Sequence, residues 1–150
     1  MTFSDFDPTR TPGVATPLPD SLAEAPLTWW RSLPPAALDL PAQRRLRAAL
    51  LALPPLPLPG WESASQGDPA AAVRAAVTAL AHTLVRPEHI EAAMSAVLLC
   101  AALGDPACAD LLVHVLGRRA RRRADLDALR LAHGWRRSGP RPPAPLAPGR

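Results

Sequence analysis

The sequence predicts an all-α protein, a small orthogonal or bundle-like domain of four to five helices with Pro-rich extended termini. Three observations support this class. Apolar residues recur at helical spacing, Asp-Pro pairs stand where helices should begin, and no stretch alternates with the period of two that a strand needs. We expect residues 1–27 to form a disordered or extended Pro-rich arm, residues 28–135 the helical domain, and residues 136–150 a flexible tail rich in Pro and Arg.

The first convincing helix is expected from about Pro41 to Leu53. Proline suits the first turn of a helix because the N–H group that it lacks would be unpaired there anyway. Leu46 and Leu50 lie on one side of this helix, opposite several arginines. The proline-rich stretch 54–60 must end it.

Two Gly-Asp-Pro-Ala sequences, at 67–70 and 104–107, mark further helix starts, because Asp can accept a hydrogen bond from the free N–H groups of a first turn. The recurrence resembles the Asp-Pro punctuation of HEAT-type helical repeats. A stable solenoid usually needs three or more repeats and no third copy exists, so we do not predict a repeat protein. The first start opens a helix to about Val85, whose predicted buried face consists of Val73, Val77, Leu80 and Leu84.

The helix that begins at Pro87 is apolar nearly all round, so we place it at the centre of the domain. Its apolar stretch Ala92–Leu103 is shorter than the ~18 residues that a membrane span needs. The predicted main face consists of Ile90, Met94, Val97, Leu98 and Ala101.

The last two helices are predicted from Pro106 to Leu116 or beyond, and from Ala124 to His133. Gly134 is expected to cap the final helix in a left-handed conformation, with Trp135 folded back on Leu129.

Charge is strongly segregated along the chain. Residues 1–116 carry 7 Arg against 11 Asp and Glu, a net charge of −4, whereas residues 117–150 carry 10 Arg against 2 Asp, a net charge of +8. This asymmetry indicates an acidic partner or surface for the C-terminal part. The N-terminus has no apolar segment typical of a secretory signal, so a cytoplasmic location is expected.

The basic cluster Gly117–Arg123 directly follows an apolar run. In a continuous helix, Arg119 and Arg122 would share the face defined by Cys108, Leu111, Leu112 and Val115. That face could not stay buried there, because an unpaired buried cation costs several kcal/mol or more. The helix should therefore break at Gly117 or leave the core. The candidate contacts to phosphates or to an acidic protein are Arg118, Arg119, Arg121, Arg122, Arg123, Arg130, Arg136 and Arg137.

Trp29 and Trp30 stand at the entrance to the helical domain. The simpler interpretation is that they pin the arm onto the core, since large side chains suit a core poor in Phe. If the pair were exposed instead, it would provide binding anchors.

Neither catalysis nor a cofactor is predicted. The four histidines show no metal-ligand spacing, and no nucleophile elbow or glycine-rich phosphate loop is present. Cys100 and Cys108 could approach each other across the turn at Gly104, but core thiols are expected rather than a disulfide.

The sequence therefore favours a non-enzymatic helical protein-protein interaction or adaptor module with a basic C-terminal segment. A nucleic-acid-binding accessory protein that uses the Arg118–Arg123 cluster is the alternative. An enzyme without a local motif is a third and weaker possibility. The oligomeric state and the identity of the partner are not predicted.

Overall fold

A computed structural model describes residues 25–82 and 85–138, and within these ranges its regular secondary structure is all helical, with no strands, as predicted. Five of its helices are long, in agreement with the four to five expected, and three short ones join them. Most of the predicted arm, residues 1–27, and of the predicted tail, residues 136–150, lies outside the described residues. Where the structure describes them, Pro26 and Leu27 belong to a short helix and residues 136–138 continue the last helix, so the helical domain extends slightly beyond the predicted bounds. The elements are the 3-10 helices η1 (Pro26–Arg31) and η2 (Pro35–Ala37) and the α-helices α2 (Leu40–Leu51), α3 (Trp61–Ser65), α4 (Pro69–Ala81), α5 (Pro87–Ala102), α6 (Pro106–Arg123) and α7 (Leu126–Ser138).

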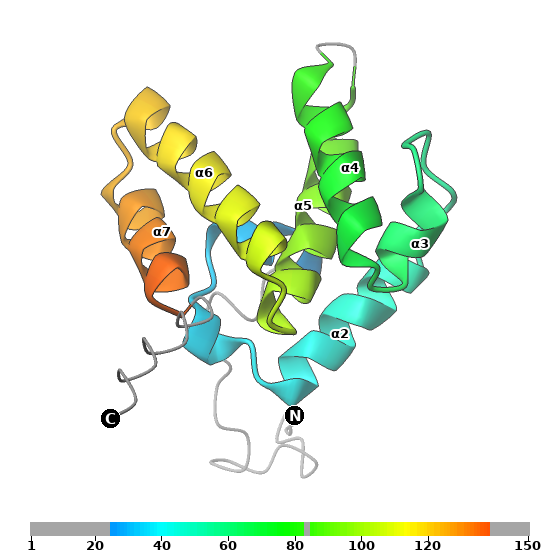
Figure 1. Ribbon diagram of the computed structural model, residues 1–150, viewed down its shortest axis with the longest axis horizontal. Helices are drawn as coiled ribbons and strands as arrows, with labels where there is room; N and C mark the ends of the chain where they lie inside the picture. Colours follow the sequence, from blue (N-terminus) through cyan, green and yellow to red (C-terminus); the bar gives the residue numbers. More distant parts are fainter. Residues whose placement is uncertain (1–24, 83–84, 139–150) are drawn as a thin grey trace, which may run out of the picture.

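Helix α5 is the centre of the fold, as the sequence predicts. Every residue from Ala92 to Ala101 is buried, so this helix must be covered on all sides. The cover comes from η1, α2, α3, α4 and α6, which pack around α5 (Figure 1). Among the described residues, no helix is both long and apolar enough to cross a membrane.

The buried face of α4 differs from the predicted one. Its larger apolar residues Val77 and Leu80 are 49% and 42% exposed. Small side chains let two helices approach closely, so the alanines of α4 make the contact with α5 and the larger residues turn outward. The helix ends at Ala81, and the predicted Leu84 lies outside the described residues. The buried residues of α4 are Ala71, Ala72, Ala75, Ala76 and Ala79.

The segment η1 is held on α5 by side-chain hydrogen bonds. Ser95 Oγ donates to the carbonyl oxygen of Leu27 at 2.9 Å, and Trp30 Nε1 donates to Glu91 Oε2 at 3.3 Å. Trp29 and Trp30 are 0% and 4% exposed, so an exposed anchor pair is ruled out. The two tryptophans belong to the core and pin η1 to it.

Helix α6 does not break at Gly117. It continues to Arg123, and its buried face follows Cys108, Leu112, Leu116 and Ala120, each four residues after the last. Of the two expectations for the basic cluster, the second holds in part: the helix continues and the face that bears Arg119 and Arg122 leaves the core. The predicted shared face is wrong, because Cys108 and Leu112 share their face with the buried Leu116 and Ala120 and not with the two arginines.

The predicted end of the last helix at Gly134 is wrong. Gly134 lies inside α7, and Trp135 is buried in the body of that helix rather than folded back on Leu129, which is exposed. The left-handed residue is Ala124, with a φ of 50°, and it ends α6. Next to it, Asp125 Oδ1 accepts hydrogen bonds from the N–H groups of Asp127 at 3.0 Å and Ala128 at 3.1 Å, which caps the start of α7.

Cys100 and Cys108 are both buried and unpaired by a disulfide, and Cys108 Sγ donates to the carbonyl oxygen of Pro69 at 3.7 Å. The neighbouring Cys100 thiol, followed by burial, raises the pKa of the Cys108 thiol above its ordinary value. Both residues therefore serve as core groups, as expected from the sequence.

Replacement of the central leucine should show how much of the stability comes from α5. Leu98 is fully buried, so Leu98→Ala is expected to lower the free energy of unfolding by ~2–5 kcal/mol in denaturant melts, through lost apolar contacts and a cavity. Leu103→Ala is the control, because Leu103 is 62% exposed and should cost less than ~0.5 kcal/mol. Equal losses would contradict the central position of α5.

The left-handed residue between α6 and α7 offers a stabilising substitution. Ala124→Gly should raise the free energy of unfolding by ~0.5–1 kcal/mol, because an L-residue with a Cβ is strained at positive φ and glycine is not. The same change at Ala48, which is exposed within α2, should lower it by ~1 kcal/mol. Thermal melts of the two variants check the opposite signs.

Candidate binding groove

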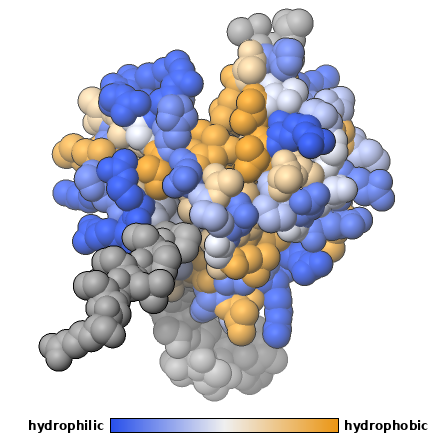
Figure 2. All heavy atoms as spheres, viewed as in Figure 1, coloured by the Kyte–Doolittle hydropathy of each residue, from blue (hydrophilic) through white to orange (hydrophobic). Residues whose placement is uncertain are grey.

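A groove of ≈ 420 Å³ opens where the second half of α6 diverges from α4 and α5. Figure 2 shows this hollow between the hydrophilic α6–α7 side and α4, with apolar residues at its floor. Its lining comes from four elements that are distant in sequence: η1, the end of α4, the start of α5 and α6. The lining residues are Trp30, Leu80, Pro87, Ile90, Glu91, His114, Val115, Arg118, Arg119, Arg122 and Arg123.

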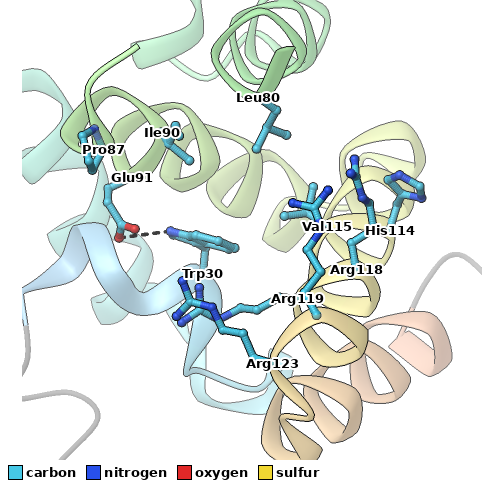
Figure 3. A pocket seen from close by; sticks show the side chains of 11 residues that line it. Trp30, Leu80, Pro87, Ile90, Glu91, His114, Val115, Arg118, Arg119 and Arg123 are labelled. Carbon is cyan, nitrogen blue, oxygen red and sulfur yellow. Dashed lines mark hydrogen bonds between the residues drawn. The ribbon is translucent and has the colours of Figure 1, made fainter. Parts of the chain in front are cut away.

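The floor of the groove is apolar and held in place. Trp30 lies between α5 and α6, with its ring fixed by the hydrogen bond to Glu91 (Figure 3). Ile90 and Val115 flank it from the two helices, and both pack partly against the core. Leu80, which the sequence pattern had assigned to the core, extends the apolar surface on the α4 side. A floor of this kind suits an apolar side chain of a ligand.

One wall of the groove is made of arginines. Arg118, Arg119 and Arg122 follow Val115 by three, four and seven residues, so a continuous helix places them on the same face. Arg123 lies at the edge of this face and also lines the groove. We call these four residues the arginine wall.

The opposite face of α6 is covered by α7, which explains why the wall points into the groove. Leu116 and Ala120 are buried on that side of α6, and Leu131 and Trp135 are buried on α7. Packing between these two helices fixes the rotation of α6 about its axis. The arginine wall therefore faces the groove and not the core.

The arginine wall is not neutralised by nearby carboxylates. Burial, followed by repulsion from Arg123 and Arg31, lowers the pKa of Arg119 below its ordinary value. In Figure 3, Arg119 and Arg123 extend from α6 toward Trp30. Among the residues that line the groove, Glu91 alone is acidic, and it already accepts from Trp30 and from Arg31 Nε at 3.4 Å. The site thus carries excess positive charge that an anionic group would relieve.

The structure separates the eight candidate arginines into two sets of four. The arginine wall lines the groove, whereas the other four lie outside it. Of these, Arg130 pairs with Asp127 Oδ1 at 3.3 Å, and Arg136 and Arg137 are exposed in the last turn of α7. The set outside the groove is Arg121, Arg130, Arg136 and Arg137.

Sequence reasoning missed the apolar half of the site. Ile90 and Leu80 were assigned to buried faces. Trp30 was expected either to attach the N-terminal arm to the core or to be an exposed binding anchor, whereas it is a buried residue whose edge forms part of the floor. The one available signal was the continuation of the Val115 face by Arg119 and Arg122, which indicates a face that is apolar at one end and basic at the other.

Within residues 25–82 and 85–138, no group of His, Cys, Asp and Glu side chains could hold a metal ion. His114 is the one histidine that lines the groove. Comparisons with protein-family models, curated proteins and solved structures show no significant similarity to this chain. The function must therefore be argued from the groove itself.

The charge of the groove can be tested with an anionic aromatic probe, 1-anilinonaphthalene-8-sulfonate. Glu91→Gln removes the carboxylate that lines the groove but keeps an oxygen that can accept from Trp30, so the probe should bind about two- to tenfold more tightly in fluorescence titrations. Glu88→Gln is the matched control, because Glu88 is exposed on α5 and does not line the groove. An equal gain in both variants would mean that the probe senses only net charge.

Proposed function

We propose that this protein is a non-enzymatic interaction module that docks an acidic protein segment bearing a large apolar side chain in the groove. The observation that carries the proposal is the combination of an apolar floor with an arginine wall that faces a single carboxylate. An apolar side chain buried on the floor would contribute ~1.5–3 kcal/mol. Carboxylates of the partner would pair with the guanidinium groups, which bind such groups in a bidentate manner.

The shape of the site favours a protein partner over a nucleic acid. A phosphate backbone needs cations along its path and gains little from the apolar floor formed by Trp30, Ile90 and Val115. A peptide segment can use both the floor and the wall. It can also be attracted from a distance by the basic surface, which raises the association rate.

Nucleic-acid binding is the second candidate function, and one observation favours it. Exposed arginines continue beyond the groove at Arg121 on α6 and at Arg136 and Arg137 on α7. A duplex that followed this surface would use both sets of arginines, whereas a docked peptide would use the arginine wall alone.

Two variants with equal loss of charge separate the two functions. The groove variant changes the arginine wall to Gln, and the outer variant changes Arg121, Arg130, Arg136 and Arg137 to Gln. Gln has a helix propensity close to that of Arg, and circular dichroism confirms that each variant is folded. If the module docks a protein, the partner captured from a lysate by the native chain is retained by the outer variant and lost by the groove variant. The captured protein should bind through an acidic segment with a large apolar residue, mapped by peptide array.

A nucleic-acid function predicts a different result for the same two variants. The slope of the log duplex-DNA binding constant against log salt should flatten in both, by as much as about 3.6 if all four lost arginines contact phosphates. If the native chain binds duplex DNA specifically near ~150 mM salt and both variants lose this binding, the nucleic-acid function replaces the docking function.

A further inference from the structure

The chain enters the structure next to the groove. Helix η1 starts at Pro26, and Trp30, in the same short helix, forms part of the groove floor. Ser95 and Glu91 hold η1 on α5 by hydrogen bonds to Leu27 and Trp30. The residues that precede η1 are therefore tethered close to the site.

The two chain ends outside the described residues differ in their charge. Residues 1–24 contain four carboxylates, Asp5, Asp7, Asp20 and Glu24, against Arg10, which gives a net charge of −3. Residues 139–150 contain two arginines and no carboxylate side chain, which gives +2 from side chains. The arginine wall would attract the first end and repel the second.

The first end also carries the apolar groups that the floor could accept. Phe3 and Phe6 are the two phenylalanines of the chain, and they alternate with Asp5 and Asp7 in the sequence Phe-Ser-Asp-Phe-Asp. This segment combines large apolar and acidic side chains within five residues. It has the chemistry that the groove requires of a docked partner.

We infer that residues 3–7 are an internal ligand of the groove, with phenylalanine on the apolar floor and aspartate against the arginine wall. This inference rests on the proposed docking function and adds regulation to that function. The N-terminal segment occupies the groove, and an external partner must displace this segment to bind. The occupancy of the groove then depends on competition within one molecule.

The length of the intervening chain permits this contact. Residues 8–25 number 18, which span at most about 60 Å when fully extended. A tether that can span the distance without being much longer sets an effective concentration on the order of the millimolar range. A segment that binds with a dissociation constant of about 0.1 mM as a free peptide would therefore fill the groove for most of the time.

The test uses a free peptide against the full-length chain. The peptide comprises residues 1–10, labelled with fluorescein at its C-terminal end, and its binding is measured by fluorescence anisotropy at ~150 mM salt. The receptor is the full chain with Phe3→Ala and Phe6→Ala, so that its own segment no longer competes. We expect this receptor to bind the peptide about tenfold or more tightly than the native chain does, because the native segment already occupies the groove.

Three controls establish that the groove is the site. A labelled peptide with both phenylalanines changed to Ala should not bind, which excludes an effect of the dye. The Phe3→Ala, Phe6→Ala receptor should no longer bind the native peptide when it also carries the four Arg→Gln changes of the groove variant. The same receptor with the four Arg→Gln changes of the outer variant should retain most of the binding. Amide chemical shifts of Ile90, Val115 and Arg119 should move between the native chain and the Phe3→Ala, Phe6→Ala variant, whereas those of Ala48 on α2 should not.

Equal affinity of the peptide for the native chain and for the double variant, or no binding to either, would overturn the inference. The proposed function is judged separately by the partner capture described above. If capture of a partner still depends on the arginine wall while the peptide fails, the groove docks other proteins but not its own N-terminus. If both fail, the groove is not a docking site.

Discussion

The complete burial of α5 is the constraint on which the rest of the structure depends. A helix with ten consecutive buried residues, Ala92 to Ala101, cannot be stable with any face in water, so the chain must wrap it. The alanines of α4 and the tryptophans of η1 provide two of the covering surfaces. The first turns of α5, with Ile90 and Glu91, reach the edge of this cover, and the groove lies there.

The groove exists because one helix performs two tasks. Helix α6 packs on both α5 and α7, and its buried face runs from Cys108 and Leu112 in the first half to Leu116 and Ala120 in the second. A cation cannot be buried without a partner, so the arginine-bearing face of the second half must remain in contact with solvent. The divergence of α6 from α5 satisfies this requirement and leaves a hollow with an apolar floor and a basic wall.

The floor and the helix that bears the wall are both held before any ligand arrives, which lowers the entropy that binding must overcome. Trp30 is fixed by Glu91, and α6 cannot rotate because α7 covers its other face. The same Glu91 also pairs with Arg31, so the one acidic group of the groove already has two partners. An incoming carboxylate therefore meets a basic wall in which burial, followed by repulsion from Arg123 and Arg31, lowers the pKa of Arg119.

The sequence by itself determined the helical class, the central place of the helix after Pro87 and the helix starts at Pro69 and Pro106, because helical spacing and the preference of proline for the first turn are local. The expected Asp cap forms at Asp105, which accepts from the N–H of Cys108, but not at Asp68. It also indicated that Arg119 and Arg122 could not be buried, whereas the choice between a break at Gly117 and a continuous helix was left to the packing of α6 against α7. Only the tertiary structure decided that the alanines of α4 are buried in place of Val77 and Leu80. How closely two helices pack depends on the side chains of both, so the pattern of one helix cannot predict it. Helix α7 also continues through Gly134, because burial of Trp135 outweighs the local tendency of glycine to end a helix. The groove belongs to this second group: Trp30, Ile90 and the arginine wall are distant in sequence, and only the packing around α5 brings them together.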